Sequence, residues 1–162
     1  MAQPERRASI EAVLRSGDVD LIDLELANEP EFLNPLMALA RERGTRVILA
    51  FHDFRGTPSN ESLLGRISAM HAKGADIAKL AVMPNDSGDV LRLLQVTAEA
   101  RRVFPSLPLA LMSMGALGGI TRVAGFLYGS DMAFAVGEQA SAPGQIPIKD
   151  ARMLAETLLR YA

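Results

Sequence analysis

Cysteine is absent from this chain of 162 residues. Its absence excludes disulfides, thiolate catalysis and zinc sites built on cysteine, and it is compatible with a reducing cytosol. Histidine is also scarce: His52 and His71 are far apart in the sequence, so they give a weak metal signal. His71 lies in a helical segment and is expected at the surface. We expect neither a metal nor another cofactor.

Long apolar runs and a large excess of one charge are missing too. The net charge of -2 provides no basic stripe for nucleic acid and no polybasic helix for a membrane surface. No run approaches the ~20 apolar residues of a membrane span, and residues 1–13 lack the apolar core of a signal peptide. With 49% hydrophobic and 22% charged residues, the chain has a globular composition. We expect one cytoplasmic domain over 1–162 that binds neither nucleic acid nor a membrane.

Five apolar runs of strand length alternate with segments of helical periodicity. The runs suit a sheet buried on both faces, and Gly44 and Gly74 stand where two helices should stop. Strands separated by single helices pair in parallel through right-handed crossovers, which leaves a doubly wound sheet or part of a barrel. The predicted strands are 19–26, 46–54, 75–83, 109–114 and 131–136.

Polar residues at the carboxyl ends of these runs favour the barrel. Active sites of (β/α) barrels are assembled at that end of the strands. A dinucleotide-binding sheet would instead show a glycine fingerprint after its first strand, and the glycines at 115–119 come late with another spacing. We therefore predict an α/β fold of the TIM-barrel type, here a partial barrel of about five parallel strands. The polar positions are Asp23, Glu25, His52, Asp53, Lys79, Ser113 and the loop 141–145.

Lys79 is the first candidate for chemistry. It lies in an apolar run, where an ammonium is costly to desolvate unless it is paired or used. Desolvation favours the free amine, which attacks carbonyl groups. The alternative is a lysine that extends from the strand end into solvent.

Three further residues stand near the same end of the predicted sheet. His52 ends its run, where it is placed to act as a general acid and base, or simply as a capping or core histidine. Asp23 and Glu25 alternate with apolar neighbours, so both side chains should point to one side of their strand. If that side is the interior they face Lys79 and His52; if not, they are solvated charges.

Later residues add candidates for binding. Arg122, at a predicted helix start, can clamp a carboxylate with two hydrogen bonds. Ser141 and Gln145 lie after the last run, in a lid over a site or in an ordinary connection. Met112 and Met114 suit a core or a pocket wall.

Together, six segments resemble type I 3-dehydroquinate dehydratase, the Schiff-base enzyme of the shikimate pathway. They occur in the family's order and extend over essentially the whole chain. The segments are VDLIDLEL at 19–26, HDF and TP within 52–58, GADIAKLAVMP at 74–84, MSMG at 112–115, ITR at 120–122 and ASAPGQ at 140–145.

The resemblance implies a lyase reaction of aromatic amino acid biosynthesis that needs no cofactor. The Lys79 amine would add to the C3 ketone of 3-dehydroquinate, and the resulting iminium would acidify the C2 proton. His52 would remove that proton and protonate the departing C1 hydroxyl, which leaves 3-dehydroshikimate. The residues implied to contact substrate are Glu25, Arg122, Ser141 and Gln145, with Met112, Met114 and Phe134 as pocket walls.

The resemblance covers only part of the family's eight-stranded barrel. The run at 19–26 resembles the fourth strand, so the chain is expected to match roughly the C-terminal two thirds. The first three strands would be missing, together with substrate-binding residues and the glutamate that orients the histidine. We hypothesise that Asp23 and Glu25 partly replace that glutamate. Activity could be impaired by the loss.

Two other functions stay open: another Schiff-base lyase such as an aldolase, and a non-catalytic subunit that needs a complementing chain. A partial barrel exposes two sheet edges and its interior. We therefore expect a homodimer, or a complex with a chain that supplies the missing strands. Residues 19–26 and 131–136 should be nearest the contact.

Overall fold

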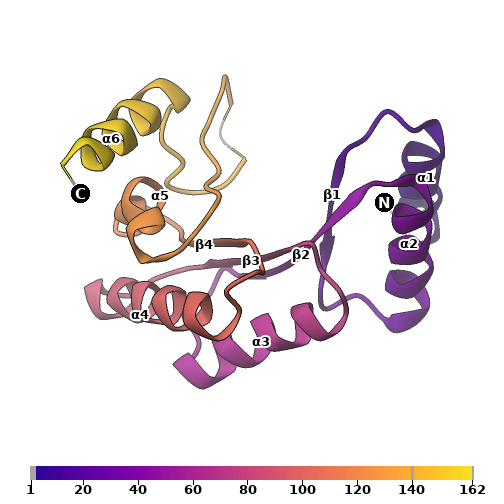
Figure 1. Cartoon of the computed structure of the whole chain (residues 1–162), viewed down its shortest axis with the longest axis horizontal. Helices are drawn as coiled ribbons and strands as arrows, with labels where there is room; N and C mark the ends of the chain where they lie inside the picture. Colours follow the sequence, from indigo (N-terminus) through magenta and orange to yellow (C-terminus); the bar gives the residue numbers. More distant parts are fainter. Residues whose placement is uncertain (1–2, 140, 162) are drawn as a thin grey trace.

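Four parallel strands form the sheet of this computed structural model, which describes residues 3–139 and 141–161. They lie side by side in the order in which they occur in the chain (Figure 1), so each connection runs between neighbouring strands. Helices separate consecutive strands, as parallel pairing requires. The strands are β1 (Leu21–Glu25), β2 (Arg46–Asp53), β3 (Ile77–Val82) and β4 (Leu109–Ser113).

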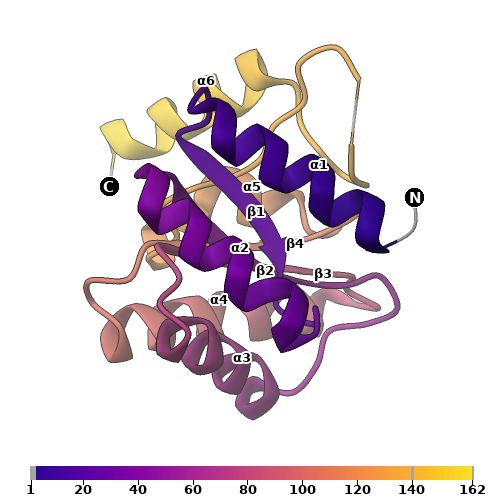
Figure 2. The same ribbon diagram turned by 90° about the vertical axis from the view of Figure 1, so that its right-hand side faces the viewer.

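The helices divide into three groups around the sheet (Figures 1 and 2). At the β1 end, α1 (Gln3–Ser16) packs beside α2 (Pro30–Arg43). In the middle, α3 (Asn60–Ala72) and α4 (Ser87–Val103) lie beneath the strands. Beyond β4 come the short helix α5 (Gly119–Ala124), the 3-10 turn η1 (Gly125–Tyr128) and α6 (Ile148–Arg160).

Both predicted helix stops are confirmed. Gly44 follows α2 directly with a φ of 73°, a left-handed conformation in which glycine has no steric cost. Gly74 follows the end of α3 by two residues with a φ of 79°. Each glycine reverses the chain into the next strand.

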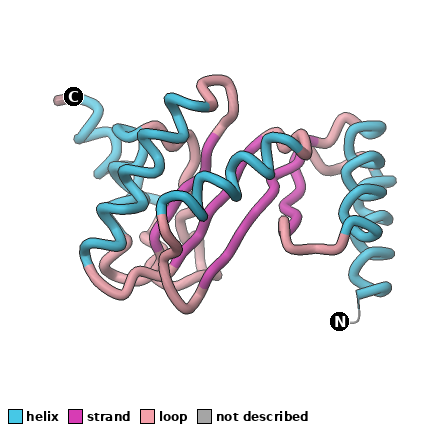
Figure 3. Tube along the Cα trace, turned by 90° about the horizontal axis from the view of Figure 1, so that it is seen from below, coloured by secondary structure: helices cyan, strands magenta, loops and turns pink. Residues whose placement is uncertain are grey.

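Most of the apolar core lies between the helices and one face of the sheet. Leu24, Leu49, Leu80 and Leu111 supply one buried leucine from each strand to this outer face. Figure 3, seen from below, shows helices crossing the strands on that side. The opposite, inner face has a smaller apolar cluster, made of Ile48, Ile77, Ala81, Ala110, Met112 and Met114. The inner face therefore has room for polar groups.

The fifth predicted strand was wrong: the segment at 131–136 does not form one. Where a further strand would offer carbonyl groups to β4, side chains take their place. The Asp131 carboxylate accepts the Leu109 N–H at 2.7 Å, and the Ser130 hydroxyl accepts the Leu111 N–H at 3.2 Å. The backbone N–H groups of Asp131 and Met132 both donate to the Leu109 carbonyl oxygen, at 2.7 and 3.2 Å. Because the β4 donors are already used by side chains, the segment does not continue along β4 as a strand. No helix among the described residues is long and apolar enough to cross a membrane.

Candidate active site

Lys79 projects from β3 onto the inner face of the sheet. Its neighbours in register are Ala50 on β2 and Ala110 on β4, and both alanines are fully buried. The lysine residue is only 9% exposed. Because both neighbours are small, its long side chain can lie across the sheet instead of extending into solvent.

Asp23 receives the end of that side chain. The Lys79 Nζ donates to Asp23 Oδ2 at 2.6 Å, reaching over β2 to β1. The ring of Phe134 lies on the ammonium as well, with its centre 4.4 Å from Nζ. The lysine is therefore held between a carboxylate and an aromatic face.

Glu25 forms the second acid–base pair of the site. One of its carboxylate oxygens is in close hydrogen-bond contact with Nδ1 of His52. This contact leaves Nε2 as the ring nitrogen available to another group. The predicted shared face of Asp23 and Glu25 is confirmed, and it faces Lys79 and His52. Of the two acids considered as partners for His52, Glu25 makes the contact, whereas Asp23 contacts Lys79.

Arg122 brings a buried cation to the same face from α5. Its residue is 6% exposed, and its guanidinium donates to the carbonyl oxygens of Phe134 at 3.0 Å and Pro143 at 3.3 Å. Its Nε has no hydrogen-bond partner among the described residues. Burial lowers the pKa of this guanidinium from its ordinary value, but an arginine stays protonated at neutral pH. A buried cation bonded to neutral carbonyls is ready to receive an anion.

The loop after η1 folds over these residues and is closed by Gln145. The side-chain oxygen of Gln145 accepts the backbone N–H of Ser141 at 2.7 Å, and its amide nitrogen donates to the Ser141 hydroxyl at 3.1 Å. Gly144 is required here, since a Cβ at that position would lie 2.1 Å from the carbonyl oxygen of Gly115. Ala140, the first residue of the resembling ASAPGQ segment, lies outside the described residues.

Most of these side chains, but neither acid of β1, line one pocket of about 130 Å³. It contains every residue predicted to bind substrate except Glu25, which reaches His52 from β1. Sequence reasoning missed three lining residues; Phe54, two positions beyond His52 and stacked on its ring, had the clearest signal. The lining consists of His52, Phe54, Lys79, Ala81, Met112, Met114, Arg122, Phe134, Ser141, Ala142 and Gln145.

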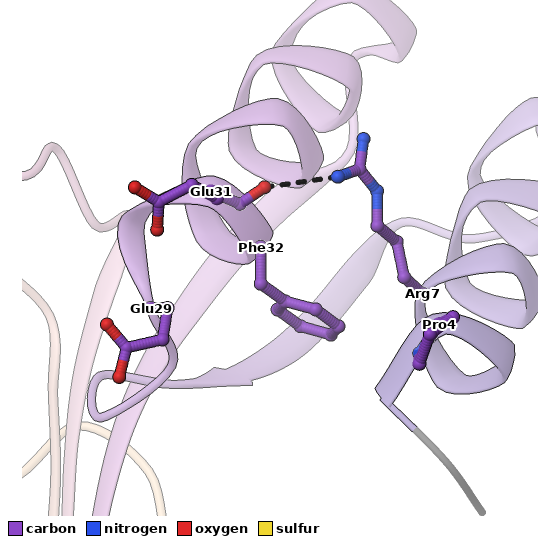
Figure 4. A pocket seen from close by; sticks show the side chains of 5 residues that line it. All are labelled: Pro4, Arg7, Glu29, Glu31 and Phe32. Atoms are coloured by element: carbon purple, nitrogen blue, oxygen red, sulfur yellow. Dashed lines mark hydrogen bonds between the residues drawn. The ribbon is translucent and has the colours of Figure 1, made fainter.

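A larger hollow of about 260 Å³ lies elsewhere, between the beginnings of α1 and α2 (Figure 4). There the Arg7 guanidinium donates to the Glu31 carbonyl oxygen at 3.1 Å. This hollow has no acid–base pair of the kind found on the inner face, so we place the candidate site at the smaller pocket. In the part of the chain that the structure describes, no three acidic or histidine side chains form a metal-binding group.

Comparison with known proteins identifies a family for this chain. The family described as type I 3-dehydroquinase matches residues 1–160. The 3-dehydroquinate dehydratase of Aromatoleum aromaticum is 48% identical over 99% of this chain and 61% of its own length. That of Geobacillus thermodenitrificans is 46% identical over 100% of this chain and 62% of its own length.

Solved structures agree with the sequence matches. The crystal structure of 3-dehydroquinate dehydratase from Geobacillus kaustophilus has a TM-score of 0.95 and 47% identity, over 100% of this chain and 62% of that one. A type I enzyme from Clostridium difficile, solved with covalently modified comenic acid, has a TM-score of 0.94 and 33% identity, over 100% of this chain and 64% of that one. This chain thus spans about three fifths of the length of these relatives.

Proposed function

This chain belongs to the type I 3-dehydroquinase family, and we propose that it converts 3-dehydroquinate to 3-dehydroshikimate through a Schiff base at Lys79. The main support is the meeting of two acid–base pairs and a buried arginine around one pocket. The relatives' shared name, 3-dehydroquinate dehydratase, points to the same reaction.

Lys79 supplies the nucleophile in the proposed reaction. Its amine adds to the C3 ketone, and loss of water gives an iminium. The positive nitrogen withdraws electrons from the neighbouring C2, which makes the C2 proton easier to remove.

His52 moves the proton in the next step. Its Nε2 takes the C2 proton, and the resulting imidazolium then protonates the C1 hydroxyl as it leaves. The Glu25 carboxylate holds Nδ1, which fixes the orientation of the ring and stabilises the positive charge that forms on it. Hydrolysis of the imine releases product and returns the lysine.

Arg122 is proposed to bind the substrate carboxylate. The loop held by Ser141 and Gln145 closes over the bound substrate, and Met112, Met114 and Phe134 form apolar walls. Closing the pocket excludes water, which strengthens the contact between guanidinium and carboxylate.

Reductive trapping tests the proposed nucleophile. Incubation with 3-dehydroquinate and borohydride should give one adduct, which mass spectrometry should locate at Lys79. The other two lysines of the chain, Lys73 and Lys149, serve as internal controls. The assignment fails if the adduct is found on either control, or if Lys79→Ala still traps substrate. Trapping of other ketones in preference to 3-dehydroquinate would point to a different Schiff-base lyase.

We further propose that the chain forms one domain, equivalent to the C-terminal two thirds of the family's barrel. In the described part of the chain, β1 pairs with β2 alone. Beside its other edge a hollow of about 300 Å³ is lined in part by Ile10, Val13 and Ile22. None of the described α6 residues is buried. These surfaces are expected to be covered in the assembled protein, since apolar area left in water costs about 25 cal/mol per Å².

A homodimer is the proposed state, with β1 and the segment 131–136 near the contact. The commonest assembly of identical subunits uses the same surface on both. Light scattering at micromolar concentration should give at least twice the monomer mass of 17.4 kDa. A monomer that unfolds cooperatively would contradict the proposal. We also propose a cytoplasmic location, because a chain without cysteine suits a reducing compartment.

A further inference from the structure

Building on the function proposed above, we propose that Asp23 is the general base and acid that moves protons at Lys79 during imine formation. Glu25 then serves His52 alone. The two carboxylates of β1 would divide the chemistry between imine formation and elimination.

The position of Asp23 suits this role. Its carboxylate contacts the reacting nitrogen of Lys79 directly, at 2.6 Å. It comes from β1 and does not line the pocket, whereas the Phe134 ring, 4.4 Å from Nζ, does. A substrate in the pocket can therefore approach the nitrogen while Asp23 stays in contact with it.

Other acids near Lys79 are already engaged or absent. The Glu25 carboxylate contacts His52. Within residues 3–139 and 141–161, Asp23 is the acidic side chain that is hydrogen-bonded to Nζ. The Asp23 side chain is 36% exposed and that of Lys79 is 11% exposed, so water can exchange with the acid while the amine stays sheltered.

The proton balance of imine formation needs such a group. An ammonium with three N–H bonds must become an iminium with one, while the ketone oxygen leaves as water with two hydrogens. Asp23 takes the first proton from the ammonium, and the free amine then attacks the carbonyl carbon. A second proton moves from nitrogen to the new alkoxide, and Asp23 returns its proton to that hydroxyl as the C–O bond breaks. The carboxylate is regenerated, and no other reactant is consumed.

A different role for the same contact predicts the opposite kinetics. If Asp23 only holds Lys79 as an ammonium, it withholds the amine from carbonyl groups, and removing the carboxylate would speed imine formation. If Asp23 moves protons, removing it slows imine formation. The sign of the change in rate separates the two roles.

Glyoxylate is a suitable probe because it has an aldehyde for Lys79 and a carboxylate for Arg122. The rate of its borohydride-trapped adduct at Lys79, measured by peptide mass spectrometry relative to Lys73 and Lys149, should fall about 10²-fold or more in Asp23→Ala and Asp23→Asn. Added formate should restore the rate in Asp23→Ala, where it has space, and not in Asp23→Asn. Asp18→Ala, an exposed acid just before β1, should behave like the unchanged protein with and without formate.

Three results would overturn the proposal: an unchanged rate, a faster rate, or a slow rate in Asp23→Ala that formate does not restore. The last would mean that Asp23 only positions the lysine. A parallel series with 3-dehydroquinate separates this proposal from the proposed function. If adducts with glyoxylate depended on Asp23 but 3-dehydroquinate gave no adduct, the proposed role of Asp23 would be supported and the proposed dehydratase activity would be contradicted.

Discussion

The two faces of the sheet are made by the same four strands but differ in content. The outer face presents a buried leucine from each strand to the helices. The inner face, one residue along, presents Asp23 and Glu25 from β1, His52 from β2 and Lys79 from β3. Neighbouring positions of a strand point to opposite faces. Residues that stabilise the core therefore alternate along the strands with residues that can take part in chemistry. Substitutions one position apart should therefore separate the two properties.

The largest effect is expected on the inner face, from His52→Ala. The variant should still form the imine at Lys79 but should lose elimination by about 10²- to 10⁴-fold, the usual contribution of a positioned acid–base group. The adduct should accumulate, which borohydride trapping and product formation, measured side by side, would show. His71→Ala is the matched control, because His71 is exposed on α3. If trapping and turnover fell equally in His52→Ala, the histidine would be structural.

The next effect belongs to the outer face. Leu80→Ala removes a fully buried side chain and should lower the free energy of unfolding by about 2–5 kcal/mol. Leu91→Ala, on α4 with 61% of its residue exposed, should cost far less. Urea denaturation of both variants measures the difference. A small loss for Leu80→Ala, next to Lys79 in sequence, would mean that the two faces are not separated as described.

The smallest effect concerns a charge remote from the inner face. Asp89, near the start of α4, accepts the backbone N–H of Asn85 at 2.9 Å and pairs with Arg92. The hydrogen bond from Asn85 is the main reason that the pKa of this carboxyl is lowered. Since its folded pKa lies below the unfolded value of about 3.9, its contribution is present above that value and is lost as the pH falls through the folded pKa.

Asp89→Asn tests this use of a charge for stability. As the pH is lowered from 5, the free energy of unfolding of the unchanged protein should fall, and that of Asp89→Asn should fall less. Urea midpoints measured at several pH values would show the difference. Its reaction with carbonyl probes at Lys79 should be unchanged. An identical pH dependence in both proteins would show that Asp89 adds nothing to stability through its charge.

Much of this arrangement could be predicted from alternation alone. The apolar run around Lys79 predicted a buried strand, and the spacing of Asp23 and Glu25 predicted a shared face; the structure confirms both. Period-two alternation fixes which side a residue faces, because every strand position obeys it. The roles of these residues in catalysis stay predictions.

What alternation does not contain is register. Glu25 and Lys79 are both level with Ala50 on β2, whereas Asp23 is level with Ile48. The contacts Lys79–Asp23 and His52–Glu25 therefore run diagonally across the sheet, each to an acid two positions nearer the start of β1. That alignment is set between strands. The failure of the fifth strand has a similar cause. Its apolar residues suit a strand, but the side chains of Asp131 and Ser130 accept hydrogen bonds from β4 N–H groups. The hydropathy pattern does not predict such side-chain hydrogen bonds.

The contact between Lys79 and Asp23 depends on the volume of an uncharged side chain, that of Ala50. Neighbouring strands lie about 4.8 Å apart, so Lys79 and Asp23 bridge backbones separated by roughly twice that distance. At the level of Lys79, the strand between them presents only the methyl group of Ala50. A valine at Ala50 would leave every charge in place and still obstruct the lysine. The contact between the two reactive groups therefore depends on a residue that takes no part in any proton transfer, and a single added branch there would separate them.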